Sequence, residues 1–142
     1  MNEVFNRQQT ASWLIHVIAH DAAKTFDSEL KKHGLTIALW PTLMCLWEKE
    51  GITQRAIARK SKVENSTTTR TLDKLERLGL IERRPDPNSR RSFNIYLTEN
   101  GRAIQRELLP IPVHVNQEYL GILEPDERKE ISRLLKKIVS QI

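Results

Sequence analysis

The chain has 142 residues, of which 39% are hydrophobic, so it can bury the core of one domain or one compact subunit. No apolar run approaches the roughly 18–20 residues of a membrane-spanning helix, and the first ten residues lack the pattern of a secretory signal. The single cysteine, Cys45, excludes an internal disulfide. We therefore expect a cytoplasmic protein with no membrane partner.

Positive charge is concentrated in the middle of the chain. The whole sequence carries a net charge of +5. Residues 53–92 hold eleven Lys or Arg against five Asp or Glu, a net charge of +6, so the remaining residues sum to −1. Such a cluster is typical of a surface that binds a polyanion, although a solvated basic face has the same composition. The secondary structure of this segment distinguishes a polyanion-binding surface from a merely solvated one.

The N-terminal third predicts two helices. Apolar residues at helical spacing follow Asn6, which with Gln9 resembles a helix start, and they predict a helix of about 25 residues that stops at Gly34. This helix is more apolar than a small domain needs, which suggests a partner surface. A second helix is expected after Thr36, with Pro41 in its first turn, where a missing N–H costs little.

Two short helices are predicted inside the basic segment. Thr53 precedes the stretch "QRAIARKS", and "KVENS" is a tight polar link to a fourth helix over about 65–78. Leu72, Leu75 and Leu78 are expected to face inward from this fourth helix. Two helices joined by a tight turn are typical of a helix-turn-helix.

A hairpin is predicted next. The strands are "LIERRP" (80–85) and "SFNIYL" (92–97), and the turn cluster "DPNS" (86–89) joins them. Alternation in the second strand places Phe93, Ile95 and Leu97 on one face. The hairpin tip carries two arginines, which can bury nothing there.

The C-terminal part predicts two more helices. Thr98 can cap a fifth helix from about 99, and Pro110 and Pro112 must kink or break it. Glu124 and Pro125 open a sixth helix. The expected fold is mainly α: a winged helix-turn-helix with a small β-hairpin wing, plus N- and C-terminal helices that form a dimerisation region. We expect a single domain (1–142) with a winged-helix lobe (36–98) and dimerisation helices (1–34 and 99–142).

The fourth helix has the composition of a groove-reading helix. Its first two turns are crowded with Ser and Thr, which are mediocre helix formers, so stability alone does not explain them. Short hydroxyl side chains let the backbone approach DNA closely. Thr68 is expected to face the core instead. The candidate DNA-binding residues are Gln54, Lys62, Asn65, Ser66, Thr67, Thr69, Arg70, Lys74, Arg90 and Arg91.

The arginines at the hairpin tip are also expected to contact DNA. Arg90 and Arg91, projecting beside the fourth helix, can reach the minor groove or the phosphate backbone, where the potential is strongly negative. Asp86 would repel phosphate, so we interpret it as wing-structuring, paired with Arg90 across the turn.

At these residues the chain resembles the multiple antibiotic resistance regulator (MarR) family of bacterial transcription factors. The resemblance rests on "TQRAIARKSKVENSTTTRTLDKLERLGLIERRPDPNSRR" and "YLTENG", including the spacing of Asp86 and Arg90 in the wing. It implies a homodimeric repressor, built from the first, fifth and sixth helices, that binds a roughly palindromic stretch of double-stranded DNA.

The resemblance also implies release of DNA by a small, often aromatic, effector. Residues that can line the corresponding cleft are Trp13, His16, His20 and Trp40, although they can equally be core or interface residues. A redox role of Cys45 is a further alternative, but a lone cysteine between Met44 and Leu46 is usually inert. No metal or cofactor is expected, since His16 and His20 have no evident third ligand.

Other classes of function lack their residues. We find no phosphate-binding glycine loop, no HExxH and no nucleophile elbow, so the chain is predicted not to be an enzyme. RNA binding is disfavoured because the basic segment lacks aromatic residues for stacking. A winged helix that binds only protein remains the main rival, and the concentrated charge argues against it.

Overall fold

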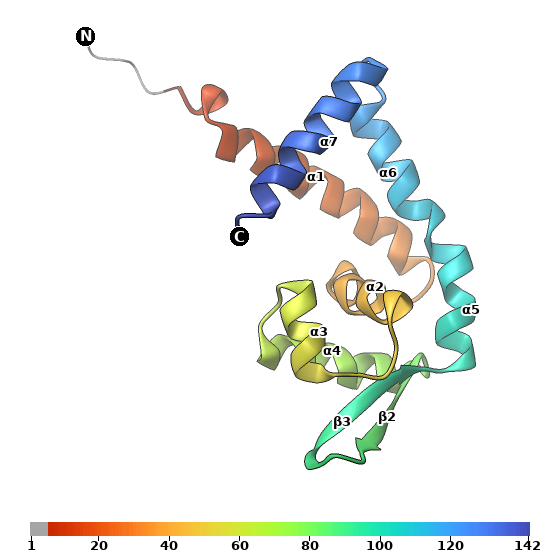
Figure 1. The fold of residues 1–142 in the computed structure, drawn as a ribbon. Helices are drawn as coiled ribbons and strands as arrows, with labels where there is room; N and C mark the ends of the chain where they lie inside the picture. Colours follow the sequence, from red (N-terminus) through yellow and green to blue (C-terminus); the bar gives the residue numbers. More distant parts are fainter. Residues whose placement is uncertain (1–5) are drawn as a thin grey trace. The chain divides into compact units, whose positions relative to one another are not determined.

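The computed structural model describes residues 6–142 and is mainly helical, with one small antiparallel sheet (Figure 1). No helix in this described part is long and apolar enough to cross a membrane. The helices are α1 (Ala11–Lys31), α2 (Trp40–Glu48), α3 (Gln54–Ser61), α4 (Asn65–Arg77), α5 (Glu99–Leu108), α6 (Pro110–Leu120) and α7 (Pro125–Val139). The strands are β1 (Ile52–Thr53), β2 (Ile81–Asp86) and β3 (Ser89–Leu97).

The chain divides into two compact units. One comprises residues up to Phe26 together with Ile111–Ile142, and therefore holds most of α1 with α6 and α7. The other is Asp27–Pro110, which holds the last turn of α1, α2 to α5 and the sheet. The predicted mainly α winged-helix architecture is confirmed.

The first helix begins later than predicted. The Asn6 side chain accepts a hydrogen bond from the Gln8 amide at 3.0 Å, but it caps a 3-10 turn over Arg7–Gln9, and α1 starts at Ala11. The predicted stop is correct, because Gly34 follows the helix with a φ of +75° that favours glycine. The apolar pattern had thus located the helix but not its first residue.

The core of the second unit is an apolar seam between short helices. Ile57 from α3 and Leu72 and Leu75 from α4 are fully buried. Leu78, which we had expected to face inward, is 39% exposed, because α4 ends at Arg77 and the chain turns away at Gly79. The remaining buried residues of this core include Leu30, Leu35, Leu39, Leu43, Leu46, Leu80, Ile81, Ile95, Leu97 and Leu108.

The sheet has one strand more than predicted, in the order β1-β3-β2. β1 has only two residues, Ile52 pairing with Ile95 and Thr53 with Asn94, which is too short to give an alternating pattern. β2 and β3 form the predicted hairpin but extend closer to its tip. Phe93 does not share the burial of Ile95 and is 49% exposed, because the hairpin projects beyond the core there.

The C-terminal predictions are confirmed in outline. The helix that starts after Thr98 ends at Leu108, and a new helix begins at Pro110, the first of the two prolines. The Thr98 hydroxyl caps α5 by accepting from the Gly101 amide at 3.1 Å. The last helix begins at Pro125 as expected, with the Glu127 carboxylate accepting from the Glu124 amide at 2.9 Å.

The base of the hairpin is tied to α5 by one carboxylate, which comes from the segment that follows α2. Glu50 Oε1 accepts from the Leu97 amide at 2.9 Å, and both Glu50 oxygens accept from the Arg102 guanidinium at 3.0 Å. The indole of Trp47 donates to the Gly101 carbonyl at 3.0 Å beside this pair. The Arg102 guanidinium, helped by the Leu97 amide, holds the pKa of Glu50 below its ordinary value even though partial burial opposes the shift.

We expect Glu50→Gln to lower the melting temperature by a few degrees at pH 7, because the variant loses the ionic acceptor of Arg102. A depressed pKa contributes stability above the ordinary value of 4.5, and that contribution is lost as pH falls through the lower folded value. The difference between the two proteins should therefore shrink in acid. Thermal unfolding followed by circular dichroism from pH 7 to pH 3 measures it.

Glu48→Gln is the matched control, since Glu48 is exposed two residues earlier, at the end of α2, and makes no ion pair within residues 6–142. A constant difference between wild type and Glu50→Gln at all pH values would contradict the role of the Glu50 charge.

Candidate nucleic-acid interface

The helix-turn-helix forms where the sequence predicts it. The Thr53 hydroxyl caps α3 by accepting from the Ala56 amide at 3.2 Å. Lys62 ends α3 in the left-handed region with a φ of 58°, an uncommon conformation for a residue with a side chain. This sharp turn lets the chain enter α4 at Asn65 after only three residues.

The two faces of α4 differ in chemistry. Thr68 and Thr71 lie inward with the two buried leucines, and the Thr68 hydroxyl donates to the Glu64 carbonyl at 2.9 Å, so the inward prediction for Thr68 is confirmed. The outward face is polar or basic and contains most of the candidate contacts. Asn65, Ser66, Thr69, Arg70 and Lys74 are exposed, and Thr67 is half-buried.

Gln54 joins the start of α3 to the start of α4. Its side-chain amide donates to the Asn65 side-chain oxygen at 3.3 Å and to the Thr69 hydroxyl at 2.5 Å. Three of the candidate residues therefore form one hydrogen-bonded cluster.

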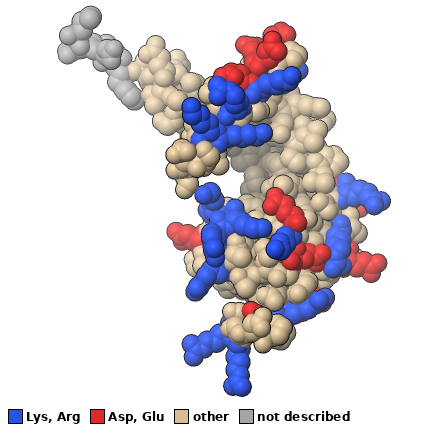
Figure 2. Space-filling view, in the orientation of Figure 1, with Lys and Arg blue, Asp and Glu red and all other residues tan. Residues whose placement is uncertain are grey.

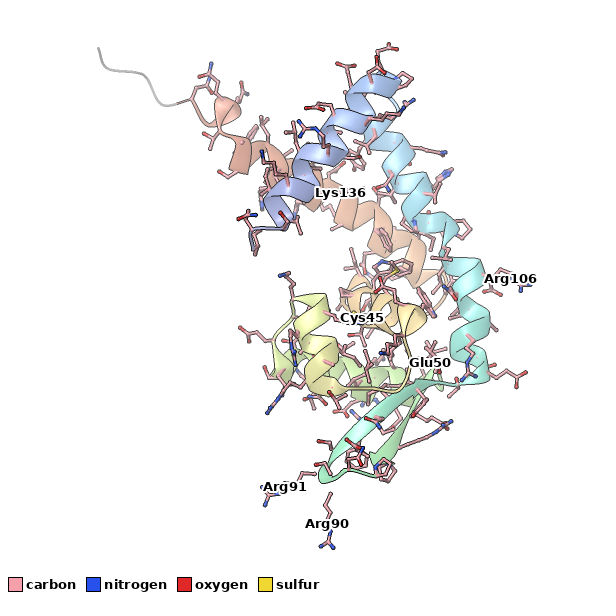
Figure 3. All side chains as sticks on the ribbon, in the orientation of Figure 1. Cys45, Glu50, Arg90, Arg91, Arg106 and Lys136 are labelled. Atoms are coloured by element: carbon pink, nitrogen blue, oxygen red, sulfur yellow. The ribbon has the colours of Figure 1, made fainter. Side chains whose placement is uncertain are left out.

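The wing presents its arginines to solvent. Arg90 and Arg91 are exposed at the hairpin tip, and Arg90 points away from the rest of the unit (Figure 3). The predicted pairing of Asp86 with Arg90 is wrong: Asp86 Oδ1 accepts from the Asn88 amide at 3.0 Å, and no ion pair joins it to Arg90 in the part of the chain that the structure describes. Asp86 thus holds the turn through a local backbone bond, which spans two residues and needs no partner across the hairpin.

Pairing separates two kinds of basic residue in the central segment. Arg83 lies 2.7 Å from an oxygen of Asp73 and 3.2 Å from one of Glu76. Arg84 pairs with Glu82 and stacks 4.0 Å above the centre of the Tyr96 ring. Within the described residues no ion pair is made by the candidate basic residues Lys62, Arg70, Lys74, Arg90 and Arg91. Three of the five acidic residues of the segment, Asp73, Glu76 and Glu82, therefore pair with arginines of β2 rather than with those of the outward surface.

The wing and the two helices enclose a hollow of about 480 Å³. It brings together the candidates Gln54, Asn65 and Arg91, and basic side chains gather around this part of the unit (Figure 2). Arg55 and Phe93 also line it and were missed from the sequence. Arg55 follows Gln54 in the first turn of α3, which is the signal that could have identified it. The lining residues are Thr53, Gln54, Arg55, Asn65, Arg83, Arg91, Ser92, Phe93 and Ile95.

The residues considered for an effector lie on two helices. Trp13, His16 and His20 belong to α1, where the two imidazole rings stack with centres 5.8 Å apart. Trp40 begins α2 and packs edge-on against Trp47 at 5.4 Å. Among residues 6–142 no group of three or more His, Cys, Asp or Glu has the arrangement of a metal site.

Cys45 has the environment of a structural residue. It is 6% exposed, and burial raises the pKa of its thiol, with a further contribution from the nearby carboxylate of Glu48. Both effects disfavour the thiolate, which is the reactive form. The structure therefore gives no support to a redox switch at this position.

A helix-turn-helix followed by a hairpin, with an outward polar helix and an arginine-tipped wing, defines a winged-helix protein. The MarR family model matches residues 35–93. The chain is 30% identical over 134 residues to the transcriptional repressor MprA of Escherichia coli strain K12, covering 91% of this chain and 76% of MprA. The chain belongs to the MarR family of transcriptional regulators, and this membership confirms that it is not an enzyme.

Two further comparisons agree with this assignment. The chain is 28% identical over 128 residues to the regulator SarZ of Staphylococcus haemolyticus, covering 90% of this chain and 86% of SarZ. The crystal structure of the S. aureus MepR–DNA complex superposes with a TM-score of 0.85 at 28% identity, covering 94% of this chain and 98% of MepR.

Proposed function

We propose that this regulator binds double-stranded DNA as a homodimer and represses transcription from a roughly palindromic operator. The observation that carries the proposal is the hollow between α3, α4 and the wing, which Gln54, Asn65 and Arg91 line, with Arg91 making no ion pair within residues 6–142. The MepR structure with DNA supports DNA binding, and the description of MprA as a repressor supports repression.

The dimensions of the DNA grooves indicate which element of this surface reads bases and which contacts the backbone. A major groove accepts one α-helix, so α4 with Asn65, Ser66, Thr69 and Arg70 is the base-reading element. Arg90 and Arg91 at the wing tip then reach the backbone or the minor groove beside it. Such a regulator acts where the chromosome is, so the cytoplasm is its proposed location.

We expect Arg90→Ala to weaken binding about tenfold on every sequence that the wild type binds, because the arginine contacts phosphate or the minor-groove potential rather than one base. The slope of log affinity against log salt should fall by about 0.9. Selection of bound duplexes from random DNA, followed by fluorescence anisotropy at several salt concentrations, measures both.

Arg106→Ala is the matched control, since Arg106 is exposed on α5 and the change in net charge is the same (Figure 3). Equal losses in the two variants would mean that only net charge matters. Wild-type binding that is flat between low and physiological salt, or no selected duplex at all, would favour a winged helix that contacts protein instead.

The proposed dimer is supported by apolar residues that the chain leaves exposed. Leu14, Ile15, Val17 and Ile18 on α1 are 43–49% exposed, and none of the residues of α7 is buried. Apolar side chains gathered on helix faces in this way are typical of protein–protein interfaces. The exposed apolar residues of α7 are Leu134, Leu135, Ile138 and Val139.

We expect the double variant Leu135→Glu, Ile138→Glu to run as a monomer and to lose affinity for a palindromic duplex, since charges would be buried in the interface. Size-exclusion chromatography with light scattering gives the mass. Lys136→Glu, a change on the same helix at an exposed basic position, should remain dimeric. A wild type with the mass of one chain would refute the dimer.

A small aromatic effector is also proposed. On one unit, α1 and α6 enclose a hollow of about 330 Å³ that His16, His20, Asp21 and Tyr119 help to line, and the Tyr119 hydroxyl donates to Asp21 at 2.5 Å. Imidazole and phenol groups beside Val17 and Ile18 suit an aromatic acid. Differential binding of about 1–3 kcal/mol to the free form is enough to release DNA.

We expect hydroxybenzoic acids to quench or shift tryptophan emission and to release the DNA, with His20→Ala binding them more weakly. Titration of the protein–DNA complex, followed by emission and anisotropy, measures both effects. Acids that leave emission and DNA binding unchanged at millimolar concentration would remove the support for this effector class.

A further inference from the structure

The cluster formed by Gln54, Asn65 and Thr69 fixes the orientation of one amide on the outward face of α4. Gln54 Nε2 lies 3.3 Å from Asn65 Oδ1, 3.3 Å from the Asn65 carbonyl oxygen and 2.5 Å from Thr69 Oγ1. An amide nitrogen is a donor only, so the Asn65 atom that faces it must be the acceptor oxygen. The Asn65 amide therefore turns its nitrogen away from Gln54.

The remaining hydrogen-bonding capacity of the cluster can be counted. Thr69 Oγ1 donates its only proton to the Asn65 carbonyl at 3.1 Å, so Thr69 can offer DNA its methyl group but no proton. Asn65 Oδ1 keeps one lone pair after accepting from Gln54. Asn65 Nδ2 donates to no residue within 6–142, and its side chain is exposed at the first residue of α4.

We propose that Asn65 reads one adenine in the major groove of each half-site, and that Gln54 is the positioning residue that makes this reading specific. Asn65 Nδ2 donates to adenine N7, and adenine N6 donates to Asn65 Oδ1. The inference rests on the proposed DNA binding and names the base that this part of the surface recognises. The first residues of a recognition helix are those that reach base edges.

The preference for adenine over guanine follows from the orientation of the Asn65 side-chain amide. Guanine presents two acceptors, N7 and O6, so its O6 would meet Asn65 Oδ1, and two acceptors repel each other. A free asparagine can turn its amide out of the base plane and donate to guanine through Nδ2 alone, but here that rotation would bring Nδ2 against the Gln54 donor. Cytosine and thymine each present only one hydrogen-bonding group in the groove. The Asn65 amide, with one donor group and one acceptor, thus disfavours guanine, and the Gln54 bond restricts the rotation that would relieve the clash.

The test begins with the selected duplex. Selection from random DNA with the wild type should return a conserved adenine in each half-site, and replacing that adenine by 7-deazaadenine removes N7 without changing base pairing. We expect the replacement to weaken wild-type binding about 2- to 12-fold, because it removes one of the two hydrogen bonds of the bidentate contact. Fluorescence anisotropy with the full-length protein measures the affinities.

Three variants separate the roles. Asn65→Ala should bind adenine and 7-deazaadenine duplexes equally, because the donor is gone. Gln54→Ala should still lose affinity on 7-deazaadenine, but its preference for adenine over guanine should fall severalfold, which a merely structural defect would not produce. Arg90→Ala should weaken both duplexes evenly and keep their ratio. Circular dichroism establishes that each variant is folded.

The outcomes separate this inference from the proposed function. If no duplex is selected, DNA binding fails and the adenine contact fails with it. If a symmetric site is selected but no adenine in it responds to 7-deaza substitution, or the response persists in Asn65→Ala, DNA binding stands and the adenine contact is overturned. An unchanged adenine preference in Gln54→Ala would overturn the positioning role of Gln54.

Discussion

The burial of one apolar seam determines what the rest of this protein can present. Ile57, Leu72 and Leu75 are fully buried between α3 and α4, which fixes the rotation of α4 about its axis. Because a helix that buries one face must expose the other, burial of these leucines is enough to turn the polar residues of α4 outward. The wing depends on the same core, since Ile95 and Leu97 of β3 are buried in the same unit.

Within residues 6–142, the ion pairs of the central segment involve arginines of β2 rather than the cationic residues of α4 and the wing tip. Asp73 and Glu76 pair with Arg83, and Glu82 pairs with Arg84, so three acidic residues of the segment neutralise arginines of β2. The positive electrostatic potential of the outward cationic residues is therefore not reduced by a carboxylate paired with one of them. Long-range attraction of a polyanion depends on that potential. Exposed ion pairs contribute little to stability, so this arrangement matters for the shape of the potential rather than for folding.

The parts of the structure with a repeating pattern could be predicted from the sequence, and the parts that depend on one contact could not. Helical periodicity and capping residues predicted α3 and α4 nearly to the residue, and they predicted the first residue of α7. β1 was missed because two residues cannot show alternation, and Phe93 was placed inward because alternation says nothing about where the core ends. The predicted pairing of Asp86 with an arginine was wrong because the carboxylate accepts from the backbone amide two residues later. That amide is always within reach, whereas an arginine across the turn is not.

The hydrogen bonds of the candidate site could not be predicted from the sequence either. Composition alone identifies Gln54, Asn65 and Thr69 as polar residues able to contact DNA, but it cannot say which of their donors and acceptors are already used. The structure shows that the Thr69 proton and one Asn65 lone pair are committed within the cluster. What a surface can recognise is therefore set by the hydrogen bonds that the protein leaves unmade, and those are known only once the intramolecular ones have been assigned.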